Sequence, residues 1–140
     1  MAVVTREISV KTKGNPDVID LTHQIRDVLG DLSLNDGIVT VFVPGSTAGI
    51  TTIEFESGVI HDLQEAFERM VPRTIPYEHN RRWGDGNGFS HVRAALCKPS
   101  LTIPFAGSTL LLGTWQQIVL VDFDNRPRTR QIILQFMGEE

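Results

Sequence analysis

The fold class is decided by the stretch QIVLVDF at residues 117–123. Its continuous apolar run is far too short to span a membrane and has the length of a buried strand. Further strand-like segments surround it at residues 100–103, 109–112 and 130–136, with turns at Gly107 and at Asp124-Asn125 between them. Four strands in succession, without regular alternation with helices, predict an α+β domain with a mainly antiparallel sheet.

The segments upstream add strands and helices to this plan. Residues 7–11 alternate between polar and apolar, which is typical of a half-buried strand, and residues 38–43 and 49–55 are rich in β-branched side chains. Apolar residues at helical spacing predict a helix over 16–30, with Asn15 as its N-cap, and another over 58–71. A short third helix is expected over 91–97. We therefore expect one domain, residues 1–140, with two or three helices packed on antiparallel sheets.

Composition narrows the function classes. The chain has 140 residues, with 13 Lys and Arg against 17 Asp and Glu, so its formal net charge is −4. A mildly acidic chain is a poor candidate for non-specific nucleic-acid binding, and we expect no nucleic-acid partner. No apolar run approaches about 18 residues, so we expect no membrane span. The first ten residues include acidic and basic side chains and no secretory apolar segment, which favours a cytoplasmic protein.

The metal ligands available are few. The single cysteine, Cys97, cannot build a zinc ribbon or an internal disulfide, so the four histidines are the only nitrogen ligands. His23 and His61 fall on the polar sides of predicted helices and are interpreted as surface residues. His79 and His91 remain, at the two ends of a polar stretch that has no apolar periodicity and is predicted to be a long loop over 77–90.

This polar stretch is the first candidate site. Between the two histidines it carries Asp85 and two arginines. A neutral imidazole and a carboxylate can hold a divalent metal, or act together as a general base and its orienting group. The alternative is a polar surface loop whose histidines are bonded locally, and the spacing alone leaves both open.

Two further segments suit an anion. If residues 126–130 are extended, Arg126, Arg128 and Arg130 share one face and offer forked donors to phosphate or carboxylate. The alternative is a solvated edge strand protected by charge. Ser46 and Thr47 lie in a small turn whose backbone N–H groups could bind an anion.

Trp115 is the last candidate. It is flanked by Thr114 and Gln116-Gln117, so the indole could stack on a ligand ring while the amides read the edge of that ring. A core or interface tryptophan with a bonded N–H is the alternative, which the sequence favours.

Taken together, these motifs resemble the YjbQ family, small proteins associated with a secondary thiamine-phosphate synthase activity. The similar segments occur in the same order along most of the chain: residues 44–51 with Glu54, Tyr77 with His79-Asn80, 85–91, 99–104, 112–118, and Phe123-Asp124 with the arginine run.

The resemblance implies an α+β fold, a homotrimer and a cleft between subunits. It also implies a transfer that joins a hydroxymethylpyrimidine pyrophosphate to a thiazole phosphate and releases pyrophosphate. Carried onto this sequence, the catalytic residues are His79, Asp85, Asn87, His91 and Glu54. The residues that bind the small phosphorylated ligand are Ser46, Thr47, Thr114, Trp115, Gln116, Arg126 and Arg128. A divalent metal, zinc or magnesium, is expected on His79 and His91.

Two positions depart from the family pattern. Gly45 and Phe89 stand where the resemblance leads us to expect histidines, and we expect the Phe89 ring to enter the pocket where a metal ligand would be. Catalytic zinc sites usually keep three protein ligands. The alternative function is therefore a non-catalytic homotrimer that binds a metal or a small anion.

Overall fold

Strand β7 (Gln117–Asp122) is buried on both of its faces. Ile118 and Leu120 point into the main apolar core, whereas Val119 and Val121 belong to a second, smaller cluster. Successive side chains of a strand alternate between faces, so two covered faces require an unbroken apolar run. The apolar run that indicated a buried strand is thus the centre of the molecule.

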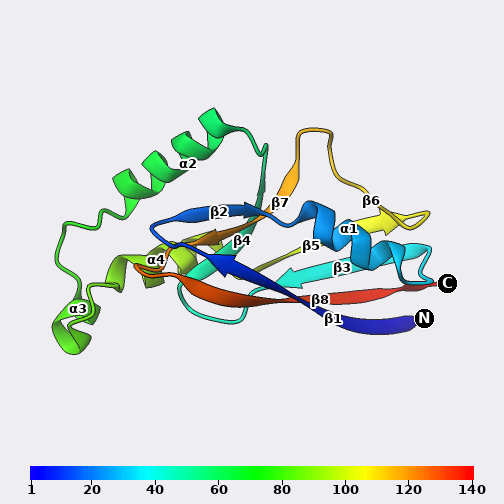
Figure 1. Cartoon of the computed structure of the whole chain (residues 1–140), viewed down its shortest axis with the longest axis horizontal. Helices are drawn as coiled ribbons and strands as arrows, with labels where there is room; N and C mark the ends of the chain where they lie inside the picture. The colour runs from blue at the N-terminus through cyan, green and yellow to red at the C-terminus, as the bar shows by residue number, and fades with distance from the viewer.

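The computed structural model describes residues 1–140 and contains two antiparallel sheets (Figure 1). The five-stranded sheet has the order β1-β8-β3-β5-β6 and the three-stranded sheet the order β2-β7-β4. Their other strands are β1 (Ala2–Thr12), β2 (Asp17–Asp20), β3 (Asp36–Phe42), β4 (Ala48–Ile53), β5 (Ser100–Ala106), β6 (Thr109–Leu110) and β8 (Arg128–Glu139). The predicted α+β class with antiparallel sheets is confirmed.

Helices cover both sides of the three-stranded sheet. The helices are α1 (Thr22–Gly30), α2 (Ser57–Met70), α3 (Glu78–Trp83) and α4 (Gly88–Cys97). Ile25 and Leu29 of α1 join the main core between the two sheets, while Phe67 of α2 and Ala94 of α4 pack on the opposite face of β7. In Figure 1, β1 and β8 accordingly lie below the three-stranded sheet and α2 above it. None of the four helices has the length and apolar character needed to cross a membrane.

The helix predicted over 16–30 is wrong in its first third. Residues 17–20 form β2, which pairs with Val119–Asp122 of β7, and the helix begins only at Thr22. Asn15 is not an N-cap, because it has a φ of +78° and lies in the turn from β1 to β2. A Cβ on Gly14 would lie 2.6 Å from the carbonyl oxygen of Asp124, so this turn requires glycine.

The polar stretch over 77–90 is more ordered than predicted. Residues 78–83 form α3, and α4 begins at Gly88, three residues earlier than the predicted third helix. No residue of α3 is buried, so the sequence carries no apolar stripe that would reveal it. The second helix, predicted over 58–71, is found at Ser57–Met70.

Candidate functional site

The predicted site residues divide between the two ends of the three-stranded sheet. In the antiparallel pair β4–β7, Ala48 lies opposite Asp122 and Ile53 opposite Gln117. Ser46 and Thr47 are therefore beside the end of β7, whereas Glu54 is beside its beginning. Six strand residues span about 20 Å, so one small molecule does not reach both ends within one chain.

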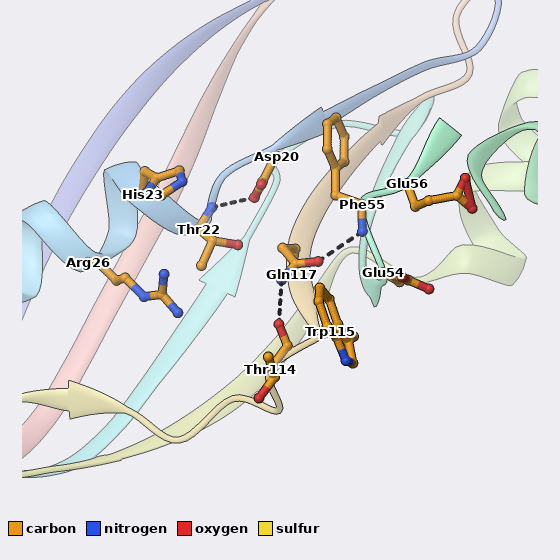
Figure 2. Close-up of a pocket in the computed structure, with 10 residues that line it drawn as sticks. All are labelled: Asp20, Thr22, His23, Arg26, Glu54, Phe55, Glu56, Thr114, Trp115 and Gln117. Atoms are coloured by element: carbon orange, nitrogen blue, oxygen red, sulfur yellow. Dashed lines mark hydrogen bonds between the residues drawn. The ribbon is translucent and has the colours of Figure 1, made fainter. Parts of the chain in front are cut away.

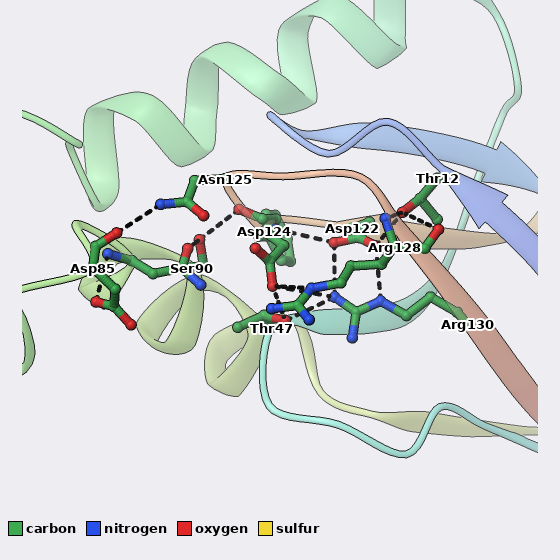
Figure 3. A network of polar contacts seen from close by, with 11 residues as sticks. Thr12, Thr47, Asp85, Ser90, Asp122, Asp124, Asn125, Arg128 and Arg130 are labelled. Carbon is green, nitrogen blue, oxygen red and sulfur yellow. Dashed lines mark hydrogen bonds and ion pairs between the residues drawn. The ribbon is translucent and has the colours of Figure 1, made fainter. Parts of the chain in front are cut away.

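We call the end of β7 the histidine end and define it by His79, Asp85, His91, Asp124 and Arg128. A buried network of ion pairs supports this end of the sheet (Figure 3). The carboxylate of Asp122, fully buried, accepts hydrogen bonds of 2.8 and 2.9 Å from Arg130 and one of 2.6 Å from the Thr12 hydroxyl. Two fixed donors on one carboxylate compensate part of the cost of burying it.

Asp124, two residues after the end of β7, belongs to the same network. Its Oδ2 accepts hydrogen bonds from the Thr47 hydroxyl at 2.9 Å and from Nε of Arg128 at 3.0 Å. Burial acts to raise the pKa of Asp124, but the Thr47 hydroxyl and the Arg128 and Arg130 guanidiniums outweigh it and lower that pKa. The other oxygen, Oδ1, is buried and has no hydrogen-bond partner within the chain. Asp124 is thus an anion with one free acceptor.

The two histidines meet because α3 and α4 lie against one another. The rings of His79 and His91 are 4.3 Å apart between centroids and inclined by 39°. Nδ1 of His79 lies 3.3 Å from Oδ1 of Asp85, yet this buried nitrogen makes no hydrogen bond. Burial, followed by the neighbouring His79, lowers the pKa of His91, against the opposing charges of Asp85 and Asp124. His91 is therefore favoured in its neutral, proton-accepting form.

Short hydrogen bonds fix the loop between α3 and α4. The amide N–H of Asn87 donates to Oδ1 of Asp85 at 3.1 Å, and the side chain of Asn125 donates to the carbonyl of Asp85 at 2.9 Å. The Ser90 hydroxyl, fully buried, donates to the carbonyl of Phe123 at 2.6 Å. The loop with Asp85 is thus tied directly to the end of β7.

Two cavities open at this end. One of about 260 Å³ includes Ser46 and His91 in its lining. Another of about 280 Å³ is lined only by polar side chains, those of Asp85, Asn87, Asn125, Arg126 and Arg128. The structure thus gathers most of the predicted site residues at the histidine end: Ser46, Thr47, His79, Asp85, Asn87, His91, Arg126 and Arg128.

The remaining predicted residues lie at the opposite end of β7. Glu54, Thr114 and Trp115 line a separate cavity there, together with Phe55. Gln116 lies in the same loop as Trp115. We call this the tryptophan end and define it by Glu54, Phe55, Trp115 and Gln117. A catalytic role of Glu54 beside His79 stays a prediction that needs a second copy of the chain.

Phe89 does not enter either cavity at the histidine end, contrary to the sequence expectation. Its ring is buried close to two guanidiniums, with the central carbons of Arg73 and Arg93 at 5.2 and 4.9 Å from the ring centroid. Such stacking is attractive because the ring face is electron-rich. The side chain at this position is directed away from the histidine pair.

Gly45, the second departure from the family pattern, has a backbone that suits glycine. Its φ is +130°, and a Cβ would lie 3.1 Å from Nη1 of Arg130. A histidine would strain this turn and press against the buried arginine.

The donors for a metal at the histidine end are His79, His91 and Asp85. No group of three or more His, Cys, Asp or Glu side chains is arranged to share one ion. The two imidazoles nevertheless lie together, and Nδ1 of His79 is an unpartnered buried nitrogen. The metal prediction stays a prediction.

Sequence reasoning missed the buried support of the site. Asp122 and Asp124 were not singled out as functional, although both are buried. Arg130 was expected to offer its donors to an anion, but it is buried and bonds Asp122 instead. The available signal was the pair of carboxylates that directly follows the apolar run of β7, since an acid at a buried strand end needs a partner. Arg128 and Arg130 both approach Asp124, as alternation along a strand requires, while Arg126 precedes β8.

The chain matches one known protein family over nearly its whole length. The family model described as UPF0047 protein YjbQ-like matches residues 6–139. The chain belongs to the YjbQ-like UPF0047 family. A UPF0047 protein of Archaeoglobus fulgidus is 35% identical over 92% of this chain and 98% of its own length. One from Mycobacterium tuberculosis is 38% identical over 86% of this chain and 91% of its own length.

Solved structures show the same fold. A YbjQ-like protein of unknown function from Sulfolobus solfataricus superposes with a TM-score of 0.93 at 28% identity, covering 99% of both chains. A hypothetical protein from Aeropyrum pernix gives 0.90 at 31% identity, covering 97% of this chain and 99% of its own. The family resemblance predicted from the motifs is thus confirmed.

Proposed function

We propose that the histidine end binds a small phosphorylated molecule. The observation that carries this proposal is the polar cavity of about 280 Å³ beside Arg126 and Arg128. Arg128 bonds Asp124 only through Nε, so its outer N–H groups have no partner in the chain. Arg126 forms no ion pair at all. Guanidiniums with free forked donors suit phosphate oxygens, and the Asp124 contact holds one of them in place.

The reaction we propose is of the thiamine-phosphate synthase type. The C–O bond between a pyrimidine methylene and pyrophosphate breaks, the thiazole nitrogen attacks that carbon, and pyrophosphate leaves with the bonding electrons. Arg126 and Arg128 would stabilise the leaving pyrophosphate as its charge develops. His91, favoured in its neutral form, and Asp85 would handle protons of the leaving group or of the ring. Zinc or magnesium, if bound, would be held by His79 and His91 and would neutralise phosphate charge.

We further propose that the active assembly is a homotrimer whose site lies between copies. Glu54, Thr114, Trp115 and Gln116 lie about 20 Å from the histidine end in one chain. They contribute to the same reaction only if a neighbouring copy brings its tryptophan end against the histidine end. This arrangement makes the site incomplete in a single chain.

The alternative function is a trimer that binds a metal or small anion without catalysis. The absence of a third histidine at Gly45 and Phe89 favours it, because catalytic zinc usually has three protein ligands.

The first experiment measures pyrophosphate binding by calorimetry and thiamine phosphate formation from the two phosphorylated halves. We expect Arg128→Met to weaken pyrophosphate binding at least tenfold, while Arg26→Met, at the tryptophan end, leaves it unchanged. Equal affinity of all three proteins contradicts the anion site. Binding without product formation selects the non-catalytic alternative.

The second experiment tests the shared site. Glu54→Gln and His91→Ala variants are each assayed alone and after mixing through reversible denaturation. Mixed trimers contain sites with both native residues, so activity should return in part. No recovery in mixed trimers contradicts a composite site, and a monomeric mass in solution contradicts the trimer. Metal content of untagged protein, compared between wild type and His79→Ala, tests the metal.

A further inference from the structure

The largest cavity of the chain lies at the tryptophan end and has a volume of about 410 Å³ (Figure 2). Three separate segments build it: the junction of β2 with α1, the link from β4 to α2, and the loop that precedes β7. It is lined by Asp20, Thr22, His23, Arg26, Glu54, Phe55, Glu56, Thr114, Trp115 and Gln117. A cavity of this volume accommodates a small organic molecule.

Two large aromatic side chains are exposed at this cavity. Trp115 is 73% exposed and Phe55 is 44% exposed. Each leaves apolar surface in water that a ligand would cover, at a gain of about 25 cal/mol per Å². Exposed aromatics that gather at one cavity indicate a binding surface more than scattered ones do.

One side chain holds the backbone of both aromatic segments. Oε1 of Gln117 accepts a hydrogen bond of 2.9 Å from the amide of Phe55, and its Nε2 donates to the carbonyl of Thr114 at 3.3 Å. Figure 2 shows Gln117 between Phe55 and Trp115. The aromatic residues are therefore attached to the sheet before any ligand arrives, which lowers the entropic cost of binding.

The amides of this loop are not free to read a ligand. The Oε1 and Nε2 atoms of Gln117 are both engaged as described. Oε1 of Gln116 accepts from the amide of Gly113 at 3.0 Å, and its Nε2 donates to the hydroxyl of Thr52 at 3.3 Å. The sequence interpretation that these amides read the edge of a ring is thus not what the structure shows. The charged side chains of the lining are therefore the groups that a polar ligand would meet.

The charges of the cavity favour a cation. Its lining contains three carboxylates, those of Asp20, Glu54 and Glu56, and one guanidinium, that of Arg26. Glu56 stays ionised because backbone N–H groups at the start of α2 lower its pKa. The side chain of Glu54 has no hydrogen bond or ion pair within the chain, so its carboxylate is a free acceptor. In Figure 2 it lies on the same side of Gln117 as the indole of Trp115.

We propose that the tryptophan end is a second binding pocket, which takes a planar organic cation stacked on Trp115 and paired with Glu54. A cation is attracted to the face of tryptophan more strongly than to any other aromatic side chain. The pocket is made by one copy of the chain and contains none of the arginines that we assign to phosphate. In the proposed trimer this pocket faces the histidine end of a neighbouring copy, so cation binding here and pyrophosphate binding at Arg128 are measured separately.

The test follows the indole N–H signals of the two tryptophans by NMR while N-methylpyridinium is added to the full chain. Trp83 is an internal control, because it is also 73% exposed but lies on α3, at the other end of the molecule. We expect the Trp115 signal to shift and saturate while the Trp83 signal stays in place. Equal, unsaturable shifts of both signals overturn the pocket.

Two matched comparisons test the charge. Phenol is a neutral ring of similar size, and we expect it to bind several times more weakly than the cation. Glu54→Gln keeps the shape of the side chain, and we expect a loss of about threefold in affinity for the cation, as for an exposed ion pair. Phenol binding as tightly as N-methylpyridinium, or no change in Glu54→Gln, overturns the assignment to a cation.

Discussion

The two ends of strand β7 differ in how their charges are held. At the histidine end, Asp122, Asp124 and Arg130 are buried and paired with one another. The partly exposed Arg128 is held by its ion pair with Asp124. At the tryptophan end, Glu54 and Arg26 line an open cavity and have no ion-pair partner in the chain. The exposed charges of the histidine end thus lie next to a buried ion-pair network, whereas those of the tryptophan end have no such network beside them.

This difference has a simple physical origin. A buried charge without a partner costs several kcal/mol, so the histidine end is fixed by its own electrostatics before a ligand binds. An exposed charge costs little, so the tryptophan end can leave carboxylates unpaired. The experiments below test how far this contrast extends, from the largest expected effect to the smallest.

Removing the central guanidinium should have the largest effect. Arg130→Met leaves the buried carboxylates of Asp122 and Asp124 without their shared cation, and we expect a loss of about 3–5 kcal/mol in the free energy of unfolding. Urea denaturation measures it. The control is Arg26→Met at the tryptophan end, where we expect a change within about 0.5 kcal/mol. Equal losses in the two variants would break the comparison.

Replacing Phe89 by histidine should cause the second largest loss of stability. Phe89→His removes an apolar ring beside Arg73 and Arg93 and puts a basic ring there, so we expect about 2 kcal/mol of destabilisation. Because this side chain is directed away from His91, the variant should gain no metal, as atomic absorption would show. Phe55→His, at an exposed position, is the matched control and should change stability little. A gain of one tightly held metal per chain is the contrary result.

The side chain of Gln117 gives a smaller and more local effect. Gln117→Ala removes the bonds to Phe55 and Thr114, at a cost of about 1 kcal/mol. Faster hydrogen exchange of the Phe55 amide, with unchanged exchange in β8, would locate the effect at the tryptophan end. If exchange rises equally throughout the protein, Gln117 acts on global stability and not on this cavity.

The pH dependence of His91 should be the most subtle difference. Because its pKa lies below the ordinary value of 6.5, the unfolded chain binds more protons than the folded one between the two values. Stability should therefore decrease as the pH falls through 6.5, and NMR titration of metal-free protein should place His91 below that value. His79→Asn removes a neighbouring positive charge and should raise the pKa of His91. A His91 that titrates above 6.5 contradicts the described environment.

The sequence predicts the parts of the fold whose side chains show a periodic pattern. Strand β7 and helix α2 were predicted nearly to the residue, because both bury apolar side chains at regular spacing. Helix α3 buries nothing and has no such pattern. Residues 17–20 fit a helical spacing with Leu21 and Ile25, and only pairing with β7, about 100 residues away, makes them a strand.

The sequence predicted most residues of the candidate site, but not that they lie at two separate ends of β7. Motifs identified His79, His91 and Trp115 without placing them at opposite ends of a strand, since this follows from the register of β4 on β7. The direction of the Phe89 ring could not be predicted either, because one of its two neighbours, Arg73, comes from the segment after α2, while Arg93 lies on α4 with Phe89 itself.

The pairing of β1 with β8 has a consequence for how this protein is made. Residues 2–12 pair with residues 128–138, so β1, which is synthesised first, cannot pair until β8 has been synthesised. Until then β1 is an unpaired edge of eleven residues, open to association with other chains. Contacts so distant in sequence also slow folding. Loss of a few C-terminal residues should therefore reduce the yield of soluble protein more than it alters either end of β7.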